Sequence, residues 1–274
     1  MISRRALLAS MTPLALSAQN SEILALPPPA PDEEIHYGDG EFQLGELRLP
    51  KTKAPHPVLI VIHGGYWRAA YDRKHIGHLC AALTAKGLAT WSLEYRRIGN
   101  PGGGWPGTFD DILKGADFVE TMSRKYTLDA KRVAVIGHSA GGHLALWLAA
   151  QRPKLRGAVP LAPIADLKRG FELKLSRGVV GELLGGSPAD VPDRYAKASP
   201  IELLPIGPRQ RLIHGASDNI VPIDISRRYV EAAKQKKSNA TLTEIPDCGH
   251  FDLIDPRSKA WPIVEHTTLQ ILPS

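Results

Sequence analysis

The sequence predicts an α/β fold, in which a mostly parallel, doubly wound sheet carries helices on both faces. The continuous apolar run Val58-Leu59-Ile60-Val61-Ile62 is typical of a strand buried on both sides. After it, strand patterns alternate with helical patterns, and the right-handed crossovers that such units require distribute the helices over both faces. The chain has 274 residues, 43% of them hydrophobic and 23% charged, which fits one large globular domain with a substantial core.

The predicted elements follow one another with a single interruption. The strand-like runs span residues 35–38, 46–49, 58–62, 88–93, 132–136, 158–161, 211–214 and 241–245, and the helical runs 73–86, 109–125, 140–150, 223–236 and 257–272. Residues 166–208 break the alternation, with one helical run at 177–184 followed by Gly185-Gly186-Ser187-Pro188. We expect this insert to form a small cap beside an open, shallow pocket.

The N-terminus predicts export. Residues 1–18 combine Arg4 and Arg5 with an apolar stretch and small residues near a cut after Ser17 or Ala18, as in a signal peptide, and they also resemble a twin-arginine export signal. The apolar run is shorter than the roughly 20 residues of a membrane-spanning helix, so we expect no integral membrane segment after processing and a periplasmic or secreted location. Residues 19–34 are expected to form a proline-rich tether, and 35–274 the folded domain.

Charge and cysteine content exclude several classes of function. The formal charge is +6, and the basic residues are scattered without the aromatic interleaving of a nucleic-acid groove, so no nucleic-acid partner is expected. The two cysteines, Cys80 and Cys248, cannot build a disulfide framework. Cys80 lies on an apolar helical face, and both are expected to be packing residues.

Three reactive side chains follow three of the predicted strands. Ser139 lies in the turn Gly137-His138-Ser139-Ala140-Gly141, Asp218 follows strand 211–214, and His250 follows strand 241–245. Because ligands of a parallel sheet gather at the carboxyl ends of its strands, we expect these side chains to meet. The chain order Ser, Asp, His is typical of one hydrolase architecture.

Each of these residue types has a task in nucleophilic catalysis. A serine hydroxyl becomes a good nucleophile when a neutral imidazole accepts its proton, and a carboxylate fixes the tautomer of that imidazole. We assign these catalytic roles to Ser139, His250 and Asp218. The backbone N–H groups of Ala140, Gly65 and Tyr66 are the expected oxyanion-hole donors.

Alternative interpretations accompany these assignments. Ser139 could cap a helix and Asp218 could form an Asx turn beside Asn219. His63 is expected to shape its loop without touching substrate, and three large aromatic residues could line the substrate pocket or fill the core. The rival acids are Asp166, Asp247 and Asp252, the rival bases are His138 and His143, and the aromatic residues are Trp67, Tyr95 and Trp105.

The motifs resemble those of the α/β-hydrolase superfamily from Val58 to the C-terminus. His63-Gly64-Gly65-Tyr66-Trp67 and Gly137-His138-Ser139-Ala140-Gly141-Gly142 are similar to the branch of animal-type kynurenine formamidases and small esterases. The segments 214–222 and 248–251 resemble the acid and histidine loops of the superfamily. The chain departs from the lipase-like relatives at Tyr66, where they carry a third glycine.

The residues and the resemblance together predict a serine hydrolase. We expect it to cleave small carboxylic esters through an acyl-enzyme on Ser139, without a metal or organic cofactor. An aryl formamidase acting on N-formylkynurenine is the alternative within enzymes. A binding protein that has the hydrolase fold but no catalysis is the alternative from another class.

Overall fold

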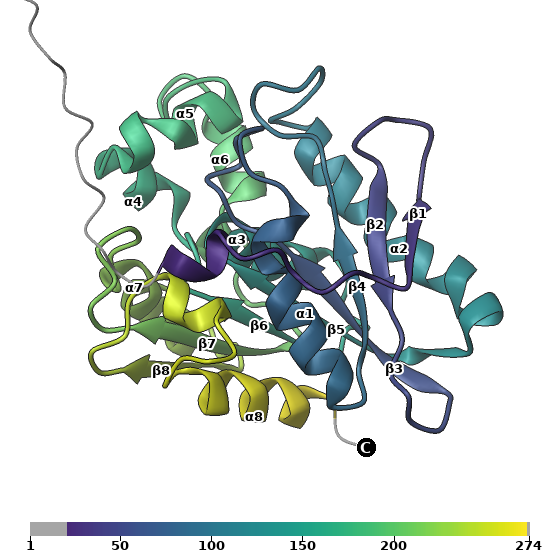
Figure 1. The fold of residues 1–274 in the computed structure, drawn as a ribbon. Coiled ribbons are helices and arrows are strands. Elements are labelled where there is room, and N and C mark those ends of the chain that lie inside the picture. The colour runs from purple at the N-terminus through teal and green to yellow at the C-terminus, as the bar shows by residue number, and fades with distance from the viewer. Residues whose placement is uncertain (1–20, 273–274) are drawn as a thin grey trace, which may run out of the picture.

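The computed structural model describes residues 21–272 as an eight-stranded sheet with helices on both sides (Figure 1). The strand order is β1-β2-β4-β3-β5-β6-β7-β8. Strand β2 pairs antiparallel with β1 and β4, and the remaining neighbours pair in parallel, which confirms the predicted mostly parallel sheet. The predicted signal peptide, residues 1–18, lies outside the described residues.

The elements agree closely with the predicted runs. The strands are β1 (Glu33–His36), β2 (Leu44–Arg48), β3 (His56–Ile62), β4 (Ala89–Leu93), β5 (Leu128–His138), β6 (Gly157–Leu161), β7 (Arg209–Gly215) and β8 (Ala240–Ile245). The helices outside the insert are η1 (Ser21–Leu24), η2 (Arg73–Ile76), α1 (Gly77–Ala85), α2 (Gly107–Tyr126), α3 (Ala140–Gln151), α7 (Asp224–Gln235), η5 (Phe251–Ile254) and α8 (Trp261–Ile271).

Strand β3 shows why its sequence is apolar throughout. Val58, Ile60 and Ile62 belong to one core cluster, together with side chains of α2 and α3. Leu59 and Val61 belong to a second cluster, with side chains of α1 and α8. Because successive residues of a strand point to opposite faces, a strand covered on both sides needs apolar residues at every position.

The N-terminal segment, predicted as a proline-rich tether before a domain that starts at residue 35, packs against the domain and contributes the start of β1. Of residues 19–34, those from 21 onward are described, and η1 buries Ile23 against the core. The Pro29 carbonyl accepts a hydrogen bond from Arg48 Nη2 at 2.9 Å, and β1 begins at Glu33. Prolines exclude a long helix here, but they do not prevent an extended chain from packing along a surface.

The insert at 166–208 holds more helix than the single run predicted. It contains α4 (Leu167–Glu172), η3 (Leu175–Arg177), α5 (Val179–Leu184), α6 (Pro192–Ala198) and η4 (Pro200–Leu203). These helices are short, so their sequence periodicity is weak, and their apolar residues pack into the core on one face of the sheet. Residues of η3 border the cavity above the sheet.

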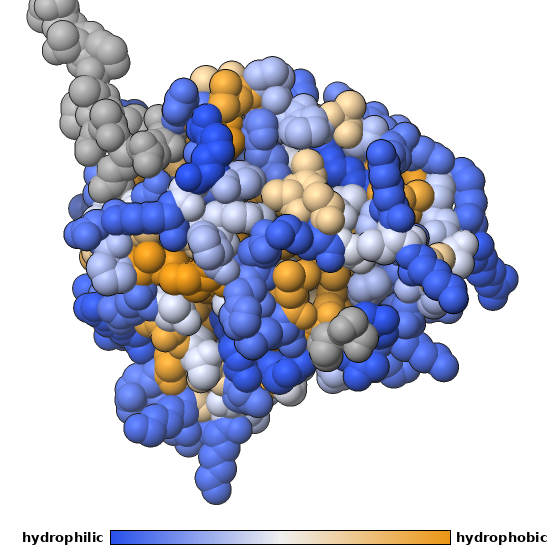
Figure 2. Space-filling view, turned by 60° about the horizontal axis from the view of Figure 1, so that its bottom comes forward, coloured by the Kyte–Doolittle hydropathy of each residue, from blue (hydrophilic) through white to orange (hydrophobic). Residues whose placement is uncertain are grey.

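On the face shown in Figure 2, hydrophilic side chains predominate and hydrophobic ones appear in separate patches. Within residues 21–272, none of the helices has both the length and the apolar character that crossing a membrane requires.

Candidate active site

Ser139 lies in a strained turn between β5 and α3. Its backbone has φ 58° and ψ −117°, a conformation that residues other than glycine rarely adopt. A Cβ at Gly137 would lie 2.1 Å from the Gly141 carbonyl oxygen, and one at Gly141 would lie 2.1 Å from that of Ile62. The glycines are therefore required by close backbone approach. The Ser139 side chain makes no capping hydrogen bond to α3, which argues against the helix-cap interpretation.

Asp218 follows β7 and uses its two carboxylate oxygens differently. Oδ1 accepts hydrogen bonds from the backbone N–H groups of Ile220 at 2.8 Å and Val221 at 2.9 Å. Oδ2 lies 2.6 Å from His250 Nδ1. The Asx turn and the contact with histidine therefore coexist, because the turn holds the carboxylate in place for the imidazole.

The hydrogen bond to Asp218 fixes the tautomer of His250. A carboxylate accepts, so Nδ1 carries the proton and Nε2 of the neutral ring is left as a base. Burial would raise the pKa of Asp218, but hydrogen bonds and charge from His214 and His250 hold it well below its ordinary value. The carboxyl group is therefore ionised at neutral pH.

His214, at the end of β7, is a supporting residue that sequence reasoning missed. Its Nε2 lies 2.9 Å from the Val221 carbonyl and 3.3 Å from Asp218 Oδ2, and its Nδ1 lies 2.8 Å from Ser226 Oγ. Since the carbonyl only accepts, Nε2 is the donor, and it faces the carboxylate as well. His214 lies at the end of β7, four residues before Asp218, and this position could have predicted its contact with the carboxylate.

Ser139 and His250 border one cavity of about 400 Å³. Gly65 and Tyr66 line it from the loop after β3, and Tyr71 and His75 line it from the next turn and η2. Residues 173–176 of the insert also line it. His75 and these insert residues carry no motif, so only the folded chain brings them to the cavity.

The loop after β3 turns sharply beside Ser139. Gly65, Tyr66 and Trp67 have φ values of 102°, 53° and 55°, three consecutive residues in the left-handed region. The Tyr66 hydroxyl donates a hydrogen bond to the Ile220 carbonyl at 2.8 Å, which ties this loop to the Asp218 turn. Ala140 is the first residue of α3, directly after Ser139. The three expected oxyanion-hole residues therefore lie on the two segments that flank the serine.

Gly64 is expected to be intolerant of a side chain. A Cβ at this position would lie 2.8 Å from the His138 carbonyl oxygen and 3.1 Å from Ser139 Cβ. Gly64→Ala must therefore displace the loop that carries Gly65 and Tyr66, and we expect kcat for an ester to fall about 100-fold. Gly207→Ala, where a Cβ meets nothing within 4 Å, is the control. Equal rates for the two variants would contradict this prediction.

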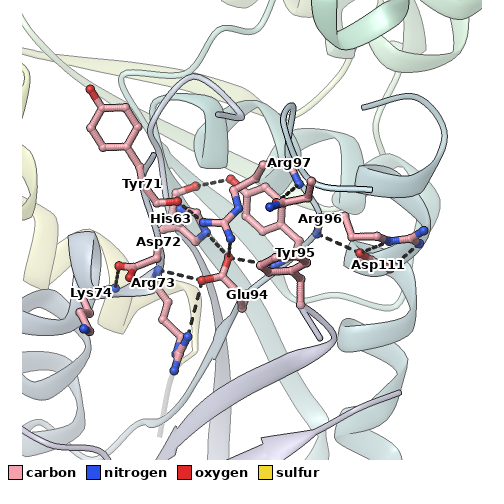
Figure 3. Close-up of polar contacts among 12 residues, drawn as sticks. His63, Tyr71, Asp72, Arg73, Lys74, Glu94, Tyr95, Arg96, Arg97 and Asp111 are labelled. Atoms are coloured by element: carbon pink, nitrogen blue, oxygen red, sulfur yellow. Dashed lines mark hydrogen bonds and ion pairs between the residues drawn. The ribbon is translucent and has the colours of Figure 1, made fainter. Parts of the chain in front are cut away.

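A buried ion-pair network supports the loop from below (Figure 3). Glu94 Oε1 lies 3.1 Å from His63 Nε2 and 3.1 Å from Arg97 Nη2, and Oε2 accepts from the Arg73 backbone N–H. Burial would raise the pKa of Glu94, but the charges and hydrogen bonds of His63 and Arg97 lower it. His63 is fully buried, in agreement with the structural role predicted for it.

The three aromatic residues expected in the substrate pocket lie elsewhere. Tyr95 is fully buried, stacks on His63 with ring centroids 4.5 Å apart and donates a hydrogen bond to the His63 carbonyl. Trp67 is fully buried edge-on against His143, and Trp105 packs against Phe109. None of them borders the cavity at Ser139. The pocket assignment was therefore wrong, and the core-filling alternative describes these side chains, because they pack into or against the core.

The rival acids are occupied away from His250 Nδ1. Asp166 caps α4, Asp247 is exposed, and Asp252 accepts a hydrogen bond from the Gly249 N–H at 2.7 Å.

Cys80 and Cys248 are buried free thiols, as expected of packing residues. Burial raises the pKa of Cys80 to about 11.

The rival bases also have other partners. His138 lies behind His250, where its Nε2 donates to the His250 carbonyl at 3.0 Å and its Nδ1 accepts from His75 Nε2 at 2.9 Å. Burial, together with His250 and His75, holds the pKa of His138 well below its ordinary value. His143 donates through Nε2 to the Ala198 carbonyl at 2.9 Å. Both rings therefore have structural contacts.

His143 makes the stability of the fold depend on pH. Burial lowers its pKa to about 4, so the unfolded chain binds more protons than the native chain between pH 6.5 and pH 4. Stability is then complete above pH 6.5 and falls as the pH is lowered. We expect the free energy of unfolding in urea to drop by about 2 kcal/mol between pH 7 and pH 5 through this residue alone. His143→Gln should show a shallower dependence, and an unchanged slope would contradict the prediction.

The segments that carry the candidate site match a known protein family. The family model named BD-FAE matches residues 46–232, a range that includes the loop after β3, the Ser139 turn and the Asp218 turn. The chain belongs to the BD-FAE family.

Within residues 21–272, no group of three or more His, Cys, Asp or Glu side chains is placed to hold a metal ion.

Relatives of this BD-FAE member include named enzymes. Esterase LipC of Mycobacterium tuberculosis is 27% identical over 81% of this chain, and kynurenine formamidase of Salmo salar is 24% identical over 81% of it. The aligned parts cover 60% and 75% of those two proteins, so the chain spans about six-tenths of the length of LipC.

Solved structures share the fold. The inhibited esterase B from Lactobacillus rhamnosis has a TM-score of 0.76 at 19% identity, covering 92% of this chain and 90% of that one. The α/β-hydrolase fold that the motifs predict is thereby confirmed for this BD-FAE family member.

Proposed function

We propose that this protein is a serine hydrolase that cleaves small carboxylic esters through an acyl-enzyme on Ser139. The 2.6 Å contact between Asp218 Oδ2 and His250 Nδ1, at the cavity that Ser139 borders, carries the proposal. It leaves His250 Nε2 free to act as a base. The similarity to esterase LipC supports an ester as the substrate.

The proposed reaction has two half-reactions. The Ser139 hydroxyl attacks the ester carbonyl carbon while its proton passes to His250 Nε2, and the backbone N–H groups of Ala140, Gly65 and Tyr66 stabilise the oxyanion. The bond between the carbonyl carbon and the alkoxy oxygen then breaks, and the proton on His250 moves to the leaving alcohol. Water repeats the sequence on the acyl-enzyme and releases the acid and free Ser139.

An aryl formamidase is the second candidate. It is favoured by the similarity to the Salmo salar kynurenine formamidase and by the loop His63-Gly64-Gly65-Tyr66-Trp67. A formamidase should show a much higher kcat/KM for a formylated aniline than for a short acyl ester. An esterase should show the reverse.

A burst experiment tests the proposed mechanism. Mixing the protein with p-nitrophenyl acetate should release about one equivalent of p-nitrophenol per site before steady turnover, because acylation by this activated ester is faster than deacylation and the acyl-enzyme accumulates. Acid quenching should leave one acetyl group on the peptide that contains Ser139. A labelled peptide elsewhere, or no reaction with a fluorophosphonate, would overturn the proposal, and the latter would favour the non-catalytic binding protein.

We also propose export to the periplasm or outside the cell, on the sequence of residues 1–18. Mass spectrometry of the N-terminus of protein recovered from the host should show cleavage after Ser17 or Ala18.

A further inference from the structure

An apolar groove lies beside the candidate active site. One wall is the N-terminal segment Leu24–Pro28, and the other consists of Ala70, Tyr71, Asp72, Lys74 and His75, around a volume of about 450 Å³. We call it the N-terminal groove. Among the described residues, the exposed large hydrophobic side chains are Leu24, Leu26 and Tyr71, at 37%, 37% and 45% exposure, and all three line this groove. Single exposed apolar residues are common, but their convergence on one groove indicates a binding surface.

The N-terminal wall of the groove is held firmly in place. Ile23 is buried, and the Leu26 carbonyl accepts a hydrogen bond from His78 Nε2 at 3.2 Å. Pro28 packs so closely on α1 that a Cβ at Gly77 would lie 2.6 Å from its ring. The exposed faces of Leu24 and Leu26 are therefore presented by a fixed backbone.

The opposite wall is fixed as well. The Asp72 side chain accepts a hydrogen bond from the Lys74 N–H at 2.9 Å, and the Tyr71 carbonyl accepts one from Arg97 of the Glu94 network. Figure 3 shows the Tyr71 side chain pointing away from this network. Because both walls are formed in advance, a ligand would lose little free energy to ordering them.

The groove adjoins the cavity at Ser139. Tyr71 and His75 line both, so the groove and the cavity meet at these two side chains. By contrast, a larger cavity of about 610 Å³ between the loop at 52–57 and α8 shares no lining residue with the Ser139 cavity. Adjacency to the cavity at Ser139 therefore distinguishes the N-terminal groove.

The position of His75 indicates which part of an ester would enter the N-terminal groove. Its ring centroid lies 5.1 Å from that of His138 and 6.1 Å from that of Phe251, and those two rings lie 4.4 Å and 5.2 Å from His250. In the proposed reaction His250 gives its proton to the leaving oxygen, so the alcohol portion must lie beside it. The groove thus begins two ring contacts away from His250, the group that would protonate the leaving oxygen.

We propose that the N-terminal groove is a subsite for an apolar arm on the alcohol portion of the ester. This inference rests on the proposed function, and it assigns the substrate class: esters of alcohols with an extended alkyl or aromatic group. Leu24 and Leu26 contact the arm, and Tyr71 and His75 lead it from the ester bond into the groove.

Two isomeric esters test the proposal. Octyl acetate and ethyl octanoate have the same atoms and similar apolarity but carry the long chain on opposite sides of the ester, and ethyl acetate carries none. For Leu24→Ser/Leu26→Ser we expect kcat/KM to fall about tenfold for octyl acetate, from the loss of apolar contact, and to stay unchanged for the other two esters. Leu24→Met/Leu26→Met should restore the wild-type value, and Leu269→Ser, in the unconnected cavity, is the matched control.

The outcomes separate the subsite from the reaction. The subsite would be overturned if Leu24→Ser/Leu26→Ser lowered kcat/KM for ethyl octanoate instead of octyl acetate. It would also be overturned if the variant and the wild type had equal kcat/KM values for every ester. In both cases the esterase activity stands. If no ester is hydrolysed, the proposed function fails, and the groove is then judged by binding. Titration calorimetry of 1-octanol with the Ser139→Ala variant should show weaker binding when Leu24 and Leu26 are serine, and unchanged binding would overturn the subsite.

Discussion

Ser139→Ala is expected to lower kcat for p-nitrophenyl acetate at least about 10⁴-fold, because it removes the atom that attacks the carbonyl. The strained backbone at φ 58° and ψ −117° would be retained, since alanine and serine have the same Cβ. Thermal unfolding should therefore be little changed while turnover is lost.

A serine away from the site provides the control. Ser123, on α2, donates a hydrogen bond to the Glu120 carbonyl at the surface, and Ser123→Ala should hydrolyse the ester at the wild-type rate. Retained turnover in Ser139→Ala would mean that the nucleophile lies elsewhere, and the acyl-enzyme mechanism would have to be abandoned.

Asp218→Asn is expected to lower kcat about 10⁴-fold, although the substitution changes few atoms. The carboxylate accepts a hydrogen bond from His250 Nδ1 at 2.6 Å, whereas an amide nitrogen at that position would donate and favour the opposite tautomer. His250 Nε2 would then carry a proton and could not accept one from Ser139. The remaining amide oxygen could still accept from the N–H groups of Ile220 and Val221, so the turn should survive.

Asp247→Asn tests the specificity of this effect. Asp247 was a rival acid on the histidine loop, but it is exposed and lies 3.8 Å from Lys259 Nζ. We expect its kinetics to match the wild type. A large loss at Asp247 with none at Asp218 would reverse the assignment of the acid.

The elements of the sheet were predictable because their signals are local. The run at 58–62 is apolar at every position, and β3 is buried along its whole length. The glycines around Ser139 likewise encode a local requirement, since the turn brings backbone atoms within a distance that no Cβ could occupy. The Gly137 constraint acts within the turn itself, against the Gly141 carbonyl, so the sequence expresses it directly, whereas the Gly141 constraint acts against Ile62 of β3.

The pocket was not predictable in this way. Trp67 is adjacent to Tyr66 in sequence, yet Trp67 is buried in the core while Tyr66 lines the cavity. Arg68 forms a two-pronged ion pair with Glu182 and donates to the Ser176 carbonyl, and these contacts position the insert beside the loop after β3. No pattern near Arg68 indicates a partner more than a hundred residues away.

The sequence by itself determined the α/β class, the strained serine turn, and the strand ends at which serine, aspartate and histidine occur. Periodicity, glycine spacing and chain order carry this information, because they reflect backbone geometry that each segment must satisfy on its own. Only the tertiary structure decided the pairing of Asp218 with His250, the support from His214 and His75, and the walls that Leu24, Leu26 and Tyr71 give to the N-terminal groove. These depend on which surfaces meet when the segments pack, and that is a property of the whole chain.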